Sequence, residues 1–409
     1  MKNFISILFF LTSYCAFAQT DWIVFNTSNS GIPHNVVEDI TIDASGNTWV
    51  ATYGGVGKFD GSNWTVFNTS NTIMPSNVCY SIKADADTIW IGTVFGLVKF
   101  DGTTWTNYPY GYVLSMGFEA NGTKWFGGYQ TGLVKYDGTT WTSYNSSNSI
   151  LSDSTYYSVA IDSDNNKWFA SVEGVFKFDD IDWTRFYTVN SDLPGDVIFS
   201  LSIDANDTKW LSIAELGIGQ FDGVTWTGYD TLNSDMPENY VNAEIAFDDN
   251  GDKWIGTSTK GLTFFDDATW TTFNTGNSGI PSNNLLDVVV DAVDNKWIGT
   301  YGSGLAVYRE NGVILYIKSI EETKGDRLFD HVPNPSHDLT TISYALLSCS
   351  DVEVTVIDGY GKHVADLVHE DQCAGSYSFP FQTNNLSPGV YSCVLKTETS
   401  RMAKKLIIY

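Results

Sequence analysis

Two glutamates of this chain have the residue type and placement of a catalytic carboxyl pair. Glu173 and Glu215 stand at the same place in two successive copies of a sequence repeat, between the second and third expected strands. A glycosidase or lyase needs two carboxyl groups at a defined separation. The repeat does not fix that separation, so ordinary loop positions remain the alternative for both residues.

A run of tyrosines marks the third copy of the repeat. Trp90 and Trp125 lie 35 residues apart, whereas the matching tryptophans of the other copies lie 41–44 residues apart. The loss falls in the linker, so we expect a notch on the face that carries the linkers and the loops between second and third strands. A tyrosine offers a flat apolar face and a hydroxyl group, which suits a glycan or a peptide. The candidate ligand-binding residues are Tyr108, Tyr110 and Tyr112 of the short linker, Phe95 and Tyr129 of adjacent loops, and Glu173 and Glu215. The alternative is a shortened loop with packed tyrosines.

Aspartate-rich turns and histidines are the remaining candidates for metal or acid–base chemistry. The best turn runs from Asp248 to Asp252, with Asp162 to Asn165 next. A helical calcium loop would need a glutamate at its twelfth position and flanking helices, whereas Lys253 and the residues after it read as a strand. We expect hairpin turns, with a Ca²⁺ site as the alternative. No Ser-His-Asp order or metal-spaced His/Cys cluster occurs, so we expect no resident cofactor and leave catalysis open.

The elements that carry these residues follow from the tryptophans. Every one of the 14 tryptophans takes one of two positions in a unit of about 41 residues. The first set is Trp49, Trp90, Trp125, Trp168, Trp210, Trp254 and Trp297; the second is Trp22, Trp64, Trp105, Trp141, Trp183, Trp226 and Trp270. Seven copies at this period predict a ring of β-sheet blades. Each blade must bury both faces of its sheet against its neighbours, and the indole rings supply much of that burial.

Each copy predicts four short strands. In the first copy these are residues 37–42, 49–52, 56–59 and 64–67, bounded by turns rich in Asp, Gly and Asn. A glycine recurs before the third strand, as expected for a backbone conformation that a side chain would strain. We therefore predict an all-β chain, with a seven-bladed β-propeller of four-stranded blades over residues 20–310.

The ends of the ring can also be assigned. Residues 22–25 match a fourth strand, although no first three strands precede them. The seventh copy has its first three strands near 285–308 and lacks a tryptophan at its fourth-strand site near 313–317. We predict that residues 22–25 complete the last blade and remove a free sheet edge. Residues 314–316 are the competing strand.

The unit D-x-x-G-N-x-W-V-A-T-x-G-G-V-G-K-F-D-G-x-x-W, read from Asp43 to Trp64, resembles the two-component regulator propeller repeat. The resemblance covers residues 21–310. It implies a relation to the sensory part of hybrid histidine kinases, where many such propellers sense glycan fragments. Since no linking sandwich domain, membrane span or kinase sequence accompanies the repeats, we expect a binding or adhesion module rather than a receptor.

Residues 331–409 differ from the repeats, and residues 311–330 read as a linker. The tail lacks tryptophan and carries Val332-Pro333-Asn334-Pro335, Leu386-Ser387-Pro388-Gly389-Val390-Tyr391 and a terminal Lys404-Lys405-Leu406-Ile407-Ile408-Tyr409. It resembles the C-terminal sorting domain (type A) of type IX secretion in Bacteroidota-type bacteria. That family implies a small antiparallel β-sandwich, the type IX machinery as partner, export across the outer membrane and removal of the tail. The alternative is a generic sandwich that stabilises the propeller.

Residues 1–19 read as a secretory signal peptide, with Lys2 before an apolar run and a small-residue cleavage site after it. Export permits disulfides, and Cys349 with Cys373 is the preferred pair because both precede strands; Cys79 and Cys393 are expected to be buried thiols. Other pairings among Cys349, Cys373 and Cys393 stay open. With 48 acidic and 22 basic residues the net charge is -26, which disfavours nucleic acid and anionic lipid as partners.

The sequence thus predicts a secreted or cell-surface propeller, without a membrane span and expected to be a monomer. Its expected role is a binding or adhesion module, with glycan as the leading ligand class and peptide as the second. The alternatives are an enzyme that acts on polysaccharides through propeller carboxylates, or a structural surface protein without a small ligand.

Overall fold

Strands and turns make up the described part of the chain. The computed structural model describes residues 21–409 apart from 131, 153–154, 311, 316–325, 330, 332–333, 347, 359–361, 374 and 398–399. The expected signal peptide and part of the competing strand at 314–316 lie outside the described residues. In the ranges that are described, the chain forms no helix with the length and apolar character needed to traverse a bilayer.

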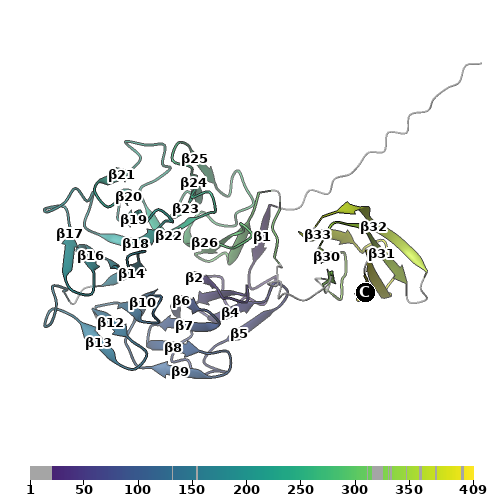
Figure 1. The fold of residues 1–409 in the computed structure, drawn as a ribbon, viewed down its shortest axis with the longest axis horizontal. Coiled ribbons are helices and arrows are strands. Elements are labelled where there is room, and N and C mark those ends of the chain that lie inside the picture. Colours follow the sequence, from purple (N-terminus) through teal and green to yellow (C-terminus); the bar gives the residue numbers. More distant parts are fainter. Residues whose placement is uncertain are drawn as a thin grey trace, which may run out of the picture.

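Seven antiparallel four-stranded sheets stand around a central channel (Figure 1). Blade 1 contains β2 (Val37–Ile42), β3 (Thr48–Thr52), β4 (Gly55–Phe59) and β5 (Trp64–Phe67). Blade 2 contains β6 (Cys79–Asp85), β7 (Thr88–Thr93), β8 (Gly96–Phe100) and β9 (Trp105–Tyr108). Blade 3 contains β10 (Val113–Phe118), β11 (Lys124–Gly128), β12 (Leu133–Tyr136) and β13 (Trp141–Tyr144). Blade 4 contains β14 (Tyr156–Ile161), β15 (Lys167–Ser171), β16 (Gly174–Phe178) and β17 (Trp183–Phe186).

The remaining blades repeat this order. Blade 5 contains β18 (Ile198–Ile203), β19 (Lys209–Ile213), β20 (Gly217–Phe221) and β21 (Trp226–Tyr229). Blade 6 contains β22 (Val241–Phe247), β23 (Lys253–Thr257), β24 (Leu262–Phe265) and β25 (Trp270–Phe273). Blade 7 contains β26 (Leu285–Val290), β27 (Lys296–Thr300) and β28 (Leu305–Tyr308), with β1 (Trp22–Phe25) as its fourth strand. The predicted seven-bladed all-β fold is confirmed.

The first strand of the chain closes the ring. β1 pairs with β28 in antiparallel register, from Trp22 opposite Tyr308 to Phe25 opposite Leu305. The Trp22 ring stacks on Tyr308 with their centroids 4.6 Å apart. Residues 313–315, in contrast, belong to no strand. The first strands of neighbouring blades pack side by side around the channel, and β26 packs against β2 to complete the circle.

Tryptophans and glycines take the roles that their spacing predicts. The seven tryptophans of the second strands are buried, each in an apolar cluster that joins two neighbouring blades. Gly55, before the third strand of blade 1, has φ +114°, and a Cβ there would lie 2.3 Å from the carbonyl oxygen of Phe67. Both the conformation and the close approach exclude a side chain at this position.

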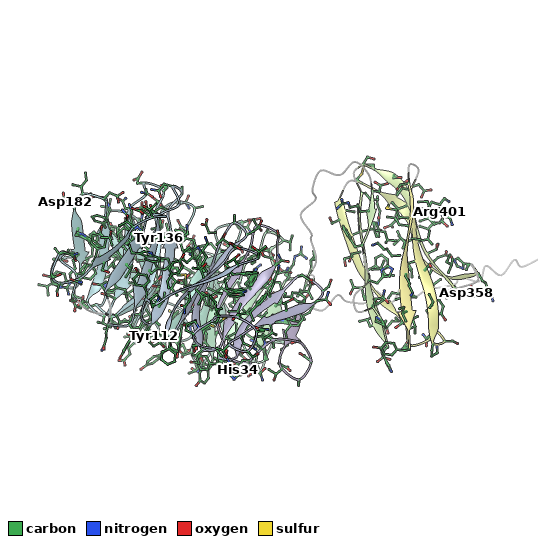
Figure 2. The ribbon with its side chains drawn as sticks, turned by 90° about the horizontal axis from the view of Figure 1, so that it is seen from below. His34, Tyr112, Tyr136, Asp182, Asp358 and Arg401 are labelled. Carbon is green, nitrogen blue, oxygen red and sulfur yellow. A yellow bond between two sulfur atoms is a disulfide. The ribbon has the colours of Figure 1, made fainter. Side chains whose placement is uncertain are left out.

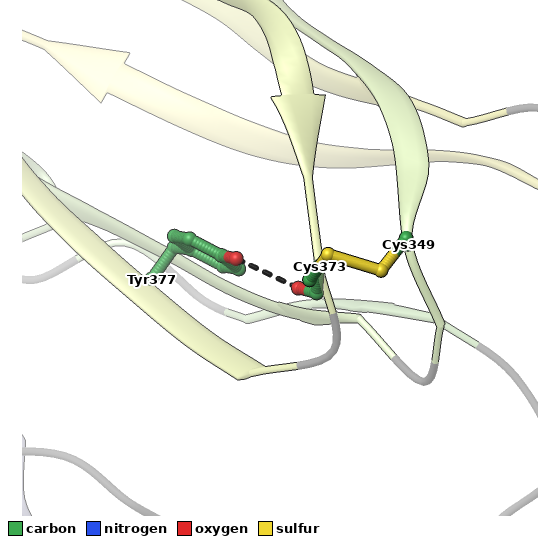
Figure 3. The surroundings of a disulfide bond; sticks show 3 residues. All are labelled: Cys349, Cys373 and Tyr377. Atoms are coloured by element: carbon green, nitrogen blue, oxygen red, sulfur yellow. Dashed lines mark hydrogen bonds between the residues drawn. A yellow bond between two sulfur atoms is a disulfide. The ribbon is translucent and has the colours of Figure 1, made fainter.

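The tail forms two antiparallel sheets. One contains β29 (Arg327–Leu328), β30 (Leu339–Leu346) and β33 (Gly375–Gln382); the other has the order β32 (His363–Gln372), β31 (Ser350–Asp358), β34 (Gly389–Lys396) and β35 (Arg401–Ile408). A disulfide joins Cys349 to Cys373, and the Tyr377 hydroxyl donates a hydrogen bond of 2.7 Å to the Cys373 carbonyl (Figure 3). Cys79 and Cys393 are buried thiols, and burial raises the pKa of each to about 12.

Candidate functional site

One face of the ring carries the linkers that enter the first strands and the loops between second and third strands. Backbone hydrogen bonds join the two kinds of segment, for example from the Tyr129 N–H to the Tyr112 carbonyl at 2.9 Å. Figure 2 shows His34 and Tyr112 on this face and Tyr136 and Asp182 on the opposite one. We call it the mouth face, because the central channel opens on it.

Each first strand has a β-bulge near the channel mouth, and in six blades the bulge aims one residue at the mouth. The register of the first strand against the second shifts after its opening residue, for example between Val37 and Asp39 in β2. The residue inside the bulge has no cross-strand partner, which is how bulges redirect side chains. The bulges of blades 1 to 5 and 7 hold Glu38, Tyr80, Leu114, Tyr157, Phe199 and Leu286, and the irregularity of blade 6 lies between Val241 and Ile245.

All six of these named bulge residues line one cavity at the mouth. Its volume is about 310 Å³, which is at the lower end of the range for small-ligand sites. Below the six bulge residues, the lining is completed by Asp39, Ser200, Glu244 and Asp287. The mouth therefore combines aromatic and leucine side chains with the carboxyl group of Glu38 at its rim and with further carboxyl groups in the channel wall.

The two channel aspartates connect neighbouring blades. The Ile82 N–H donates to Asp39 Oδ2 at 2.7 Å, and the Ile40 N–H donates to Asp287 Oδ2 at 2.9 Å. Burial, reinforced by the nearby Glu244 carboxyl, raises the pKa of Asp39 to about 7. Burial and the charges of Asp39 and Glu244 also raise the pKa of Asp287 well above its usual value.

Serines take the place of these aspartates in four other blades. Each serine hydroxyl donates to a backbone carbonyl of the next first strand, as Ser81 Oγ does to Val113 O at 3.3 Å. The other three are Ser115, Ser158 and Ser200. In blade 6 the position belongs to Glu244, since Ala246 pairs with Trp254 as Thr41 pairs with Trp49 in blade 1. Carboxyl groups therefore take this position in blades 1, 6 and 7, and in the six blades other than blade 6 the side chain bonds to the next first strand.

Five aromatic side chains form a continuous group on the mouth face, which we call the mouth cluster: His34, Tyr53, Tyr80, Tyr112 and Tyr129. Successive ring centroids are 5.9, 5.7, 4.8 and 5.7 Å apart. The Tyr53 and Tyr80 hydroxyl oxygens lie 3.4 Å apart. Burial and hydrogen bonding with Tyr80 raise the pKa of both Tyr53 and Tyr112, so these phenols remain protonated. The cluster offers apolar ring surface together with neutral hydroxyl groups.

The candidates from the short linker separate into different environments. Tyr112 and Tyr129 belong to the mouth cluster, and Phe95 is 72% exposed in the loop between β7 and β8. Tyr108 instead packs between blades 2 and 3, with its ring centroid 5.8 Å from Trp90. It ends the fourth strand of its blade, where Phe67 of blade 1 stacks on Trp49 in the same way. Our expectation that Tyr108 lines a surface notch is corrected accordingly.

Tyr110 lies between these two environments. Its ring centroid is 4.3 Å from that of Trp141, in the fourth strand of blade 3. Together with Tyr112 it covers a separate cavity of about 130 Å³ at the seam between blades 2 and 3. The short linker therefore does leave open space, although most of that space is inside the seam.

Glu173 and Glu215 lie in equivalent loops but have different local environments. Glu173 forms an ion pair of 3.7 Å with Arg185, whose Nε also donates to the Glu173 carbonyl at 2.8 Å. Glu215 has φ +60° in the tight loop before β20. No hydrogen bond or ion pair links the two glutamates among the residues that the structure describes.

The aspartate-rich turns use their carboxylates inside the hairpin. Asp248 accepts hydrogen bonds from the backbone N–H of Asn250 and Asp252 and from Trp254 Nε1, at 3.0, 3.1 and 3.0 Å. Asp162 binds Asn166 and Trp168 in the same manner. Across the described ranges, no group of three or more His, Cys, Asp or Glu side chains is placed to hold a metal ion.

The bond from an indole N–H to an acidic side chain six residues earlier recurs in six blades. The pairs are Trp49–Asp43, Trp125–Glu119, Trp168–Asp162, Trp210–Asp204, Trp254–Asp248 and Trp297–Asp291. Blade 2 has Ala84 at this place, and Trp90 Nε1 is buried without a hydrogen-bond partner in the described part of the chain. The acidic residue six positions before each of these tryptophans can be recognised in the sequence alone.

Comparisons with known proteins agree with the two parts of the chain. Residues 332–409 match the family described as "Secretion system C-terminal sorting domain". No curated protein sequence matches the chain. The extracellular domain of a putative hybrid two-component system from B. thetaiotaomicron is similar in structure, with a TM-score of 0.62, 16% identity, and coverage of 95% of this chain and 57% of that one.

Two further solved structures share the fold. PorZ, a surface component of the type IX secretion system of Porphyromonas gingivalis, gives a TM-score of 0.59 at 19% identity, with coverage of 94% of this chain and 61% of that one. A virginiamycin B lyase from Staphylococcus aureus gives 0.57 at 14% identity, with coverage of 70% and 99%. The chain thus spans about three fifths of the length of the first two structures.

These observations establish the class of the protein. The ring of seven blades has the fold of extracellular propeller domains, and the tail matches a domain that directs export. The protein is a secreted or cell-surface β-propeller that carries a type IX secretion C-terminal sorting domain at residues 332–409.

Proposed function

We propose that the protein is a glycan-binding module of the bacterial surface or its surroundings, exported through its tail by the type IX machinery. The observation that carries the proposal is the mouth cluster, where four tyrosines and a histidine form a continuous platform beside the channel. Sugar rings have apolar faces that pack on aromatic rings and hydroxyl groups that bond to phenols. The resemblance to two-component regulator propellers, many of which sense glycan fragments, points to the same ligand class.

The carboxyl groups that line the mouth cavity restrict the kind of glycan. Glu38, Asp39, Glu244 and Asp287 line the same cavity as Tyr80 and Tyr157. An acidic sugar would bring another negative charge next to this group, and like charges at close range oppose binding. We therefore expect neutral or amino sugars as ligands, and we expect uronates and sulfated sugars to be rejected.

The test is a glycan array probed with the full chain, followed by calorimetric titration of the best oligosaccharide. Tyr112→Ala should weaken binding by about tenfold or more, since loss of one stacked aromatic ring typically removes 1–3 kcal/mol at a sugar- or base-stacking site. Tyr129→Ala should act in the same direction.

Tyr240→Ala is the matched control. Tyr240 lies on the mouth face at the entry to blade 6 and is 52% exposed, close to the 47% of Tyr129, but it lies outside the mouth cluster. It should leave affinity unchanged. Equal losses for Tyr240→Ala and Tyr112→Ala, or an array that selects only acidic glycans, would contradict the proposal.

The ion pair of Glu173 with Arg185 gives the enzymatic alternative less support. A carboxylate that is occupied by an ion pair with a guanidinium is less available to act on a substrate as a general base or acid. Glu173→Gln is the direct test of that alternative, with release of products from polysaccharides as the readout.

A further inference from the structure

Six of the seven linkers between blades insert one aliphatic side chain into the seam that they cross. These side chains are Ile32, Met74, Leu151, Leu193, Met236 and Ile280, and all six are buried. In each case the backbone N–H of the inserted residue faces a Ser or Thr hydroxyl two positions earlier. In five of the six, proline follows directly. We call these residues the seam plugs.

The seam plugs all enter the same environment. Met74 packs with Val56, Cys79 and Ile91, which are the second residue of β4, the first residue of β6 and a central residue of β7. Leu151 packs with Leu133, Tyr156 and Phe169 at the same positions one seam further along the ring. The site is thus built by three strands from two blades and does not depend on the plug for its walls.

The seam between blades 2 and 3 has these walls but no plug. Leu97, Val113 and Phe126 stand where Met74 and Leu151 have their neighbours, and they form one buried cluster. The short linker from Tyr108 to Val113 contains no aliphatic residue before the strand begins. A cavity of about 130 Å³ remains, and Leu97, Val113, Phe126 and Val134 line it beneath Tyr110 and Tyr112.

We propose that this cavity binds an isoleucine, leucine or methionine side chain of an extended partner peptide that has Ser or Thr two residues before it and Pro directly after it. The chain itself shows what the site accepts, since six copies of the same walls hold such a segment. Apolar cavities of about 150 Å³ in proteins bind molecules of the size of benzene, so the volume suffices for one side chain. The site opens to the surface beside exposed Gly111 and Ser143.

The peptide site and the proposed glycan platform share Tyr112 but differ in the rest of their residues. The specificity of the peptide site resides in the apolar walls Leu97, Phe126 and Val134, whereas the platform uses the outer rings of the mouth cluster. Peptide binding and glycan binding can therefore fail separately, and both should be measured on each variant.

The experiment titrates the full-length chain with synthetic copies of its own linker. The probe is the peptide Asn-Ser-Gly-Ile-Pro-Ser, as at residues 277–282, and the control peptide has Ala in place of Ile. The Ile peptide should bind about tenfold to a hundredfold more tightly, the ratio expected when most of one aliphatic side chain enters an apolar site.

One variant locates the binding. Replacement of the short linker by residues 68–77, which contain Met74, should fill the cavity with its own plug, abolish peptide binding and raise the melting temperature. Equal affinity of the Ile and Ala peptides, or full peptide binding by the variant with the long linker, would overturn the proposal.

Discussion

The same substitution should have different consequences in two nearly identical tryptophan sites. Trp49 and Trp90 are 2% and 1% exposed. Each stacks on an aromatic ring of the fourth strand of its blade, and each lies under a third-strand lysine, Lys58 or Lys99. The difference is the indole N–H, which reaches Asp43 at 2.8 Å in blade 1 and finds no partner in the described part of blade 2.

Phenylalanine isolates that difference. Trp49→Phe and Trp90→Phe both remove one ring and leave a similar space, so the packing loss is shared. Trp49→Phe also breaks a hydrogen bond to a carboxylate, which is worth about 1.5–3 kcal/mol. Trp90→Phe removes a buried unsatisfied N–H, whose burial costs about 1–3 kcal/mol. We therefore expect Trp49→Phe to lower the free energy of unfolding by about 2.5–6 kcal/mol more than Trp90→Phe.

The measurement is equilibrium unfolding in urea, followed by far-ultraviolet circular dichroism because both substitutions alter the fluorescence. A shift of the midpoint at constant slope reports the stability change. The double variant Asp43→Ala with Trp49→Phe completes a cycle that gives the coupling of the pair directly. Equal losses for the two tryptophans would refute the view that the carboxylate bond, rather than ring burial alone, stabilises the repeat.

The architecture was readable because its causes are local. Three signals predicted it: tryptophans 41–44 residues apart in all copies but the short one, a glycine before each third strand, and an isolated fourth strand at residues 22–25. Each signal depends only on a few neighbouring residues and the sheet that they form. The departures from the pattern also have local signals. Ala84 stands where six other copies have an acid, and the linker before Val113 lacks the aliphatic residue that six others carry.

The candidate site was harder to predict, because it is assembled across blades. Tyr53 comes from a loop of blade 1, Tyr80 from a bulge in β6, and Tyr129 from a loop of blade 3. Their contacts depend on the curvature of the ring and on which way each bulged residue points. Tyr108 was assigned to the surface because it begins a tyrosine-rich linker. Its place at the end of a fourth strand, which matches that of Phe67, was the better guide, because both rings stack on the second-strand tryptophan of their blade.

Three further substitutions test the packing of the ring and the charges in its channel. Ala86 is exposed at φ +53°, so Ala86→Gly should raise stability by about 0.5–1 kcal/mol in thermal unfolding; a loss would contradict a left-handed turn there. In β1, the Val24 carbonyl accepts a hydrogen bond from the Asn29 side chain and therefore points away from β28. Since the N–H and the carbonyl of one residue in an antiparallel strand point to the same side, the Val24 N–H also points away from β28, and the Ile23 N–H points toward it. Ile23→Pro should therefore cost about 1–3 kcal/mol more than Val24→Pro, and similar losses would argue against closure of the ring by this strand. The channel aspartates should make stability depend on pH. The pKa of Asp39 is raised to about 7 in the folded state, so the folded state binds the carboxyl proton more tightly than the unfolded state does. The contribution of this proton to the free energy of unfolding is therefore complete below about pH 4 and is lost as the pH rises through 7. For a half-buried group, the raised pKa of Asp39 corresponds to a loss of about 2–4 kcal/mol in the free energy of unfolding between pH 4 and 8. The raised pKa of Asp287 acts in the same direction. Replacement of both by serine, as in four other blades, should flatten urea-measured stability between pH 4 and 8, and an unchanged slope would show that these carboxyl groups are ionised at no cost in the channel wall.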